Sequence, residues 1–175
     1  AFGLSEPGSG SDAGALTTRA VRDGDGWVLD GEKAWISGGD VAGVIVVWAR
    51  TGEAGGKGVT AFLVEPGTPG FAVGRHEEKL GLRASHTVSL SFEGCRVPDA
   101  ARLGAPGQGL HLALAALDGG RIGIAAQATG TIRAALEAST RYAQERQAFG
   151  RPIARHQAVA FMLADLAVEH ETARL

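Results

Sequence analysis

The first residues with clear chemical potential form a short loop rich in glycine and serine, residues 4–12, with the sequence LSEPGSGSD. Pro7 restricts its own φ to about −65°, and Gly8 and Gly10 can take positive φ without steric cost. Such a segment exposes successive backbone N–H groups, with serine hydroxyls beside them, and proteins bind pyrophosphate and other anions on surfaces of this kind. The loop contains neither a Walker sequence nor G-x-G-x-x-G, and its composition is also typical of a surface turn.

The triplet Trp35-Ile36-Ser37 is a second candidate, and two glycines follow it directly. An indole can stack on a flat ring, and a serine hydroxyl can donate to a ring nitrogen. An aromatic packing residue at the end of a strand is the other interpretation of Trp35. Beside the glycine–serine loop, the triplet favours contact with a flat ring.

Asp118 and Arg121 lie three positions apart and enclose the pair Gly119-Gly120. Residues at this spacing are neighbours on a helix, so an ion pair within the helix is one interpretation. The glycines remove side-chain bulk and would let a ligand approach the backbone, so a ligand-binding role for the two charged residues is the other.

Arg146, Phe149 and Gln157 form the last group of candidates. An arginine can hold a phosphate through two parallel hydrogen bonds, a phenylalanine offers a face for a purine, and a glutamine offers both donors and acceptors. Capping of a helix end and packing in a core explain the same residues without a ligand.

The elements that must position these residues change in type along the chain. Residues 16–103 contain short β-rich runs separated by turn signals, and Asp-Gly pairs at 23–26 and 30–31 indicate hairpins. We expect strands at residues 16–21, 27–29, 44–49, 59–64, 71–74, 87–92 and 95–97. Many short strands at this spacing predict an antiparallel barrel or sandwich, and the run 44–49 suits a buried strand.

The second part of the chain has helical periodicity. We expect one helix from residue 110 that ends at Asp118-Gly119-Gly120, a second from Arg121 to about Arg146, and a third with an apolar stripe over residues 159–173. The turn-rich segment 104–109 marks a domain boundary. The predicted fold class is therefore α+β, with a middle β domain at residues 1–103 followed by the start of a C-terminal α-helical bundle at 104–175.

Composition argues against several classes of function. A net charge of −2 gives no electrostatic reason to bind nucleic acid or a membrane surface, and the longest apolar run, residues 41–49, is far shorter than the ~20 residues that span a bilayer. The single cysteine, Cys95, suits a reducing compartment and a packing role. The chain starts without methionine and stops within a helical pattern, so we expect a soluble, internal fragment of a longer protein.

Five blocks in a fixed order, spread over the whole chain, resemble the acyl-CoA dehydrogenase family. They are the loop at 4–12, KAWISG at 33–38, EKLGLR at 78–83, LDGGRI at 117–122 and ERQAFG at 145–150. Five collinear blocks are far more specific than any one of them. Within the family, the pattern is similar to short-chain or branched-chain members, which act in fatty acid or branched-chain amino acid catabolism.

The resemblance implies that the protein binds FAD. The implied cofactor-binding residues are Phe2, Leu4, Ser5, Gly10, Ser11, Trp35, Ile36, Ser37, Arg146, Phe149 and Gln157. Trp35 would contact the isoalloxazine and Ser37 would lie near N5, although Gly38 replaces the Asn that many members carry. Arg146, Phe149 and Gln157 would bind the adenosine-diphosphate part of FAD in a neighbouring subunit, which implies a dimer or tetramer that shares FAD across its interface.

The resemblance also implies the reaction. The family removes the α-proton of an acyl-CoA thioester with a carboxylate while a hydride leaves the β-carbon for the flavin, and the product is the enoyl-CoA. Ser11, Asp118 and Arg121 are the implied substrate-binding residues. The base is a Glu that most members carry in a loop expected beyond Leu175, and a minority carry it at the position of Gly120, which cannot serve. We therefore expect no catalytic residue within this chain, and no metal site.

The implied electron acceptor is an electron-transfer flavoprotein, and the implied location is the cytoplasm in a bacterium or the mitochondrial matrix in a eukaryote. Two other functions stay open. One is an acyl-CoA oxidase or flavin monooxygenase of the same fold, which consumes oxygen without an added carrier. The other is a DNA-binding relative, which needs a basic face that the nearly balanced charges of residues 104–175 do not supply.

Overall fold

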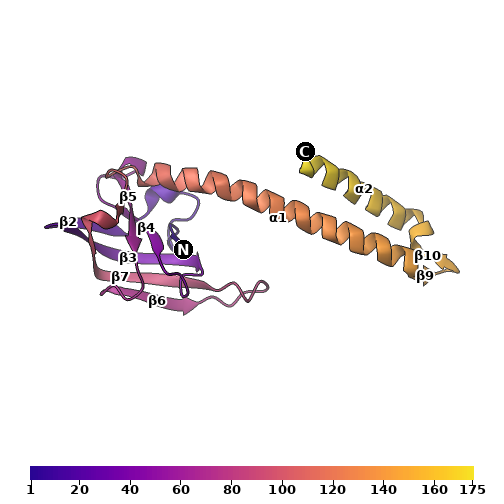
Figure 1. Cartoon of the computed structure of the whole chain (residues 1–175), viewed down its shortest axis with the longest axis horizontal. Helices are drawn as coiled ribbons and strands as arrows, with labels where there is room; N and C mark the ends of the chain where they lie inside the picture. Colours follow the sequence, from indigo (N-terminus) through magenta and orange to yellow (C-terminus); the bar gives the residue numbers. More distant parts are fainter. The chain divides into compact units, whose positions relative to one another are not determined.

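The computed structural model describes residues 1–175 and consists of two compact units, Ala1–Ala115 and Ala116–Leu175 (Figure 1). The first unit contains the strands β1 (Phe2–Gly3), β2 (Arg19–Asp23), β3 (Gly26–Ser37), β4 (Ile45–Arg50), β5 (Val59–Val64), β6 (Phe71–His76), β7 (Thr87–Pro98) and β8 (Arg102–Leu103). The helix α1 (Gly109–Glu145) begins in the first unit and continues into the second. The strands β9 (Gln147–Ala148) and β10 (Arg151–Pro152) and the helix α2 (Gln157–Arg174) complete the second unit.

All strands of the first unit belong to one mixed sheet. Its order is β6-β7-β3-β2-β4-β5-β8, and β1 pairs with β4 outside this path. Neighbours are antiparallel, except that β1 and β2 each pair with β4 in parallel. The predicted α+β class, a β domain followed by the first helices of a helical domain, is confirmed. The predicted sheet was purely antiparallel, and these two short parallel pairings are a departure from it.

The two longest strands, β3 and β7, correct the predicted strand boundaries. Asp30-Gly31 is not a turn: β3 runs through it, paired with β7 on both sides. The predicted gap between residues 92 and 95 is a β-bulge in β7, where Leu29 pairs with Cys95 but Gly31 pairs with Phe92. Gly94 has a φ of 60° there, and its N–H donates to Asp30 at 2.7 Å. A bulge interrupts side-chain alternation without ending the strand, so the sequence pattern resembles two strands.

The main core lies on one face of this sheet, which curls so that strands distant in the sheet order meet. Trp27 on β3 and Phe62 on β5 have ring centroids 5.4 Å apart. Alternate residues of β4, Ile45, Val47 and Ala49, are fully buried in this core. Fourteen residues form the cluster: Ala20, Trp27, Leu29, Ile36, Ile45, Val47, Ala49, Phe62, Val64, Val88, Leu90, Phe92, Cys95 and Val97.

A second, smaller core covers the other face of β4 and β5. It contains Leu4, Leu16, Trp48 and Ala113, of which Ala113 belongs to the first turns of α1. The indole N–H of Trp48 donates to the carbonyl of Gly109 at 2.7 Å and ties the start of α1 to the sheet. Because both faces are covered, β4 has no exposed residue, as the apolar run predicted. The strand predicted at 16–21 begins later, at Arg19, because Leu16 is buried in this second core.

The second unit corrects the predicted helix boundaries. Asp118-Gly119-Gly120 does not interrupt a helix, and α1 is continuous through it, so Arg121 lies inside a helix and not at its start. Glycine in a helix interior costs only about 1 kcal/mol relative to alanine, and the segment contains no proline. The helix α2 was predicted correctly, and it runs back beside α1 in Figure 1.

No helix combines the length and apolarity needed to cross a membrane. Cys95 is a free, fully buried residue of the main core. Burial, with a contribution from the nearby charge of Asp30, raises the pKa of its thiol to about 11. The thiol is therefore protonated at neutral pH, in agreement with the packing role that the sequence predicted.

Substitution of Gly31 tests whether β3 is continuous through Asp30-Gly31. Its φ is 145°, and a Cβ there would come within 2.7 Å of the backbone Cα of Thr18. We expect Gly31→Ala to lower the free energy of unfolding by about 1–3 kcal/mol, as strained backbone conformations do. Thermal denaturation monitored by circular dichroism measures the effect. Gly43→Ala is the matched control, because a Cβ there meets no atom within 4 Å, and equal melting temperatures for both variants would contradict the prediction.

Candidate functional site

The glycine–serine loop is a hydrogen-bonded turn. Glu6 and Ser9 exchange two backbone hydrogen bonds of 2.8 and 3.1 Å around Pro7-Gly8, and the Ser9 hydroxyl donates to the carbonyl of Asp12 at 2.6 Å. Neither Gly8 nor Gly10 uses its freedom to take positive φ. The hydrogen bonds define the turn. The two glycines leave its outer surface without side chains, and a Cβ on either would meet no atom within 4 Å.

A buried ion pair fastens this loop to β3. Lys33 is fully buried and Glu6 is 3% exposed, and the ammonium of Lys33 donates to Oε1 of Glu6 at 2.8 Å. Lys33 also donates to the carbonyl of Leu4 at 3.1 Å. The Glu6 carboxylate accepts the backbone N–H groups of Thr17 and Thr18 at 2.6 and 2.9 Å, and the Thr17 hydroxyl at 2.7 Å. Both charges are therefore hydrogen-bonded as well as paired.

The pKa values of this pair reflect burial and hydrogen bonding together. Burial alone would raise the pKa of Glu6, but hydrogen bonds from Lys33, Thr18 and Thr17 outweigh it and hold the pKa at about 2. Burial lowers the pKa of Lys33, and its contact with Glu6 opposes that change. The carboxylate is therefore ionised at neutral pH.

Sequence reasoning did not find this pair. Lys33 and Glu6 are 27 positions apart, and a charge within a strand is normally read as a solvated position. The only local signal is that Lys33 lies in a block with apolar neighbours on its C-terminal side, Ala34 to Ile36.

Next to the ion pair, a β-bulge in β3 exposes Trp35. Lys33 pairs with Leu90 of β7 but Ile36 pairs with Val88, so β3 contains one extra residue. Trp35 takes a φ of 58°, and its side chain is 56% exposed. A positive φ is rare for a bulky residue and marks positions where the surrounding structure imposes it. An exposed indole held in this way is suited to stack on a ligand.

The bulge and the loop lie side by side. The N–H of Ala34, adjacent to Trp35, donates to the carbonyl of Ser5 at 2.9 Å. Ser37 is exposed at the end of β3, and Gly10 and Ser11 are exposed in the loop. The structure thus brings the loop and the Trp35–Ser37 triplet together, as the cofactor-site prediction requires.

Three further residues of this unit that were predicted to bind the cofactor, Phe2, Leu4 and Ile36, have side chains that are wholly or partly buried. Leu4 and Ile36 are buried in the two cores, so their side chains support the site and only their backbone can reach a ligand. The ring of Phe2 packs on that of Trp48, with centroids 4.3 Å apart, and is 37% exposed.

Ser11 also lines a cavity of about 1100 Å³. Its wall includes Leu16, Arg50, Leu110 and Leu114. Arg50 has no free donor for an anionic ligand, because its guanidinium donates to the carbonyls of Gly14, Leu16, Glu53 and Gly55. Trp35 and Ser37 do not line this cavity.

In the second unit, Arg146, Phe149 and Gln157 surround one hairpin. The strands β9 and β10 pair through the two-residue turn Phe149-Gly150, whose φ values are 52° and 73°. Positive φ at both central residues is typical of the type I′ hairpin turn. The turn leaves Phe149 95% exposed, and Arg146 and Gln157 are exposed beside it, at the end of α1 and the start of α2.

Asp118 and Arg121 are exposed in the interior of α1, and no ion pair joins them. The bonded pair on this helix is Arg133–Glu137 instead, at 2.8 Å. A Cβ on Gly119 or Gly120 would meet no atom within 4 Å, so this face of the helix is open. Both charged side chains are free to contact a ligand.

Two family models together match most of the chain. The model described as "Acyl-CoA dehydrogenase, middle domain" matches residues 1–95, and the model described as "Acyl-CoA dehydrogenase, C-terminal domain" matches residues 107–175. The chain belongs to the acyl-CoA dehydrogenase family, and the resemblance predicted from five sequence blocks is confirmed.

Individual relatives refine this assignment. The chain is 51% identical to the mitochondrial short-chain specific acyl-CoA dehydrogenase of Rattus norvegicus, over 99% of this chain and 42% of that protein. Its structure is similar to butyryl-CoA dehydrogenase from Megasphaera elsdenii, with 42% identity, a TM-score of 0.96, and coverage of 99% of this chain and 46% of that one. A glutaryl-CoA dehydrogenase of Mycobacterium smegmatis in complex with FADH2 shares 40% identity, with a TM-score of 0.90 and coverage of 98% and 43%. The chain spans less than half the length of these relatives.

The Glu6–Lys33 pair predicts a specific dependence of stability on pH. Because the pKa of Glu6 is about 2 in the folded protein and 4.5 as its ordinary value, its contribution is complete above pH 4.5 and is lost as the pH falls toward 2. We expect this contribution to be about 3 kcal/mol. Urea denaturation between pH 7 and pH 2 would measure it as the difference in pH dependence between the native protein and Glu6→Gln.

The matched control is Glu32→Gln, which removes an exposed carboxylate adjacent to Lys33 in sequence. We expect this variant to keep the native dependence on pH. If Glu6→Gln kept it as well, Glu6 would not be the titrating group.

Proposed function

We propose that the protein containing this chain is an FAD-dependent acyl-CoA dehydrogenase that converts a short-chain or branched-chain acyl-CoA thioester to the enoyl-CoA. The observation that carries this proposal is the exposed Trp35 at a strained bulge, held beside a glycine–serine loop by a buried ion pair, in a chain of the acyl-CoA dehydrogenase family. Relatives named for short-chain and butyryl-CoA substrates support the substrate class.

The residues present in the first unit fit a flavin. The indole of Trp35 offers an exposed flat face, and the Ser37 hydroxyl is exposed two residues further along β3. The exposed backbone of Gly10 and Ser11 offers N–H groups to a phosphate. FAD, when bound, supplies the acceptor for the hydride that leaves the β-carbon of the substrate. The chain's own residues would orient its ring system and shield one face of it from water.

The hairpin of the second unit fits the other end of the cofactor. The guanidinium of Arg146 would bind a phosphate, Phe149 would cover the adenine, and Gln157 would donate to it. In the proposed assembly these residues act on the FAD of a neighbouring subunit. Phe149 is 95% exposed, so its ring is free to contact a partner outside this chain. The assembly would be a dimer or tetramer.

Asp118, Arg121 and Ser11 would bind the thioester substrate. Arg121 and Asp118 lie on the open face of α1 created by Gly119 and Gly120, where a ligand can approach the helix closely. We place the general base that removes the α-proton outside this chain, because Gly120 has no side chain. Its carboxylate would need a raised pKa, which burial in an apolar site supplies. The proposed electron acceptor is an electron-transfer flavoprotein.

The first test concerns FAD. We expect Arg146→Ala to weaken FAD affinity about ten- to hundredfold, the effect of losing one charged hydrogen-bond partner. Flavin absorbance after dialysis, and rebinding of FAD to the apoprotein, would measure it. Arg141→Ala, which removes another exposed arginine of α1, is the control and should keep its flavin. A native protein that takes up no FAD would refute the proposed function.

The second test concerns the substrate. We expect Arg121→Ala to lower kcat/KM for butyryl-CoA about ten- to hundredfold while flavin content and melting temperature stay native. Arg133→Ala is the control, since it breaks only an exposed pair with Glu137 and should cost under about 1 kcal/mol of stability without a kinetic effect. Unchanged kcat/KM in Arg121→Ala would assign this residue no role in binding.

A further inference from the structure

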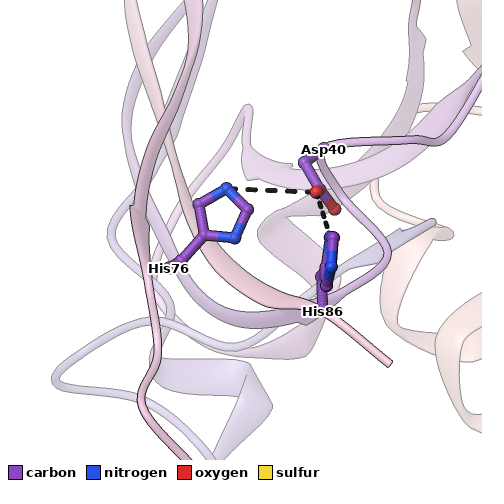
Figure 2. A group of neighbouring side chains, drawn as sticks. All are labelled: Asp40, His76 and His86. Atoms are coloured by element: carbon purple, nitrogen blue, oxygen red, sulfur yellow. Dashed lines mark hydrogen bonds and ion pairs between the residues drawn. The ribbon is translucent and has the colours of Figure 1, made fainter. Parts of the chain in front are cut away.

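One side-chain cluster is not used by the proposed function, and it lies where three neighbouring strands end. β6 ends at His76, β7 begins directly after His86, and β3 ends three residues before Asp40. These strands are consecutive in the sheet, in the order β6-β7-β3, and each is antiparallel to the next. The end of β6, the start of β7 and the end of β3 therefore meet at one end of the sheet, where the side chains of Asp40, His76 and His86 lie together (Figure 2).

Backbone hydrogen bonds hold the three residues in place. The N–H of Gly38 donates to the carbonyl of His86 at 2.9 Å, and the N–H of Glu77 donates to the carbonyl of Thr87 at 2.8 Å. Each residue of the cluster thus lies within two sequence positions of a backbone hydrogen bond that joins neighbouring strands. Their convergence follows from the sheet and does not depend on a flexible segment.

One nitrogen of His76 and one nitrogen of His86 are both directed at the same carboxylate oxygen of Asp40 (Figure 2). Nδ1 of His86 lies 2.5 Å from Oδ2 of Asp40, and Nε2 of His76 lies 3.9 Å from the same oxygen. One such atom from each of the three residues lies within 4.8 Å of both others. The second oxygen of the carboxylate, Oδ1 of Asp40, is buried and has no hydrogen-bond partner.

We propose that Asp40, His76 and His86 form a binding site for Zn²⁺. Two imidazoles and one carboxylate are a ligand set that zinc uses in sites with three protein ligands and one water. Mg²⁺ and Ca²⁺ prefer sites made of oxygen alone, so the two histidines favour a transition metal. Bonds of about 2.0–2.2 Å to a tetrahedral ion separate its ligands by about 3.3–3.5 Å, which small side-chain rotations reach from the observed distances.

The surroundings leave room for the fourth ligand. His76 and His86 line a cavity of about 540 Å³, together with Lys79 and Arg83. His76 and His86 are 57% and 48% exposed, whereas the Asp40 side chain is 14% exposed. A water on the zinc ion would lie on this accessible side, with the carboxylate behind the ion.

A hydrogen bond between Asp40 and His86 is the simpler explanation of part of this geometry. It explains the 2.5 Å contact, but not the unpartnered Oδ1, nor the position of His76, whose nitrogen is too far from Asp40 for a hydrogen bond. Buried polar atoms without partners are rare and costly, and a cation beside the carboxylate would remove that cost. Zinc would also fasten the end of β3 three residues beyond Ser37.

His76→Ala gives the sharpest test, because it removes a proposed ligand and leaves the Asp40–His86 contact intact. The protein containing this chain would be freed of metal with a chelator and titrated with Zn²⁺ by calorimetry, and its melting temperature measured with and without zinc. We expect one zinc ion to bind at this cluster, with affinity reduced at least about tenfold in both His76→Ala and His86→Ala. Zinc should raise the melting temperature of the native protein more than that of either variant.

His111→Ala is the control, since His111 is an exposed histidine of α1 away from the cluster, and it should bind zinc like the native protein. Absence of zinc binding to the native protein would overturn the proposal. Binding that persists undiminished in His76→Ala would overturn it as well, because the ion would then lie elsewhere. These outcomes do not depend on dehydrogenase activity.

Discussion

The arrangement of the first unit depends on the buried contact between Glu6 and Lys33. Removal of two charges from water is costly, and only good pairing together with further hydrogen bonds compensates for it. Here Thr17, Thr18 and the carbonyl of Leu4 supply those bonds. The loop, the segment before β2 and the interior of β3 must therefore all be in place before the pair is stable. Three segments distant in sequence are held together by one contact.

This requirement explains why the residues next to the pair can be exposed and strained. Trp35 keeps a positive φ because Lys33 on one side and Ile36 on the other are both buried and cannot shift. In the hairpin of the second unit, Phe149 is exposed by a two-residue turn, which requires no buried ion pair. The bulge and the turn each place an aromatic ring on the surface at a defined position, and recognition of a flat ligand requires such a ring.

Features determined by local pattern could be predicted from the sequence, and features determined by distant contacts could not. The strand at 59–64 and the helix after His156 follow from periodicity and from flanking turn residues. The predicted end of a helix at Gly119-Gly120 is wrong. Two glycines cost too little free energy to end a helix that otherwise consists of good helix formers. The hairpin turn predicted at Asp30-Gly31 is wrong, because the pairing of β3 with β7 overrides the local turn signal. The Glu6–Lys33 pair and the Asp40 cluster join residues that only the sheet brings together.

The bulge in β3 also constrains how this segment can change in length. Lys33 and Ile36 are three residues apart and both are buried, whereas a regular strand would turn them to opposite faces. The extra residue between them therefore acts as a fixed spacer. Loss or gain of one residue there would move either the ammonium of Lys33 or the side chain of Ile36 into water. Substitution of a side chain along this stretch preserves that spacing, whereas insertion or deletion of a residue does not.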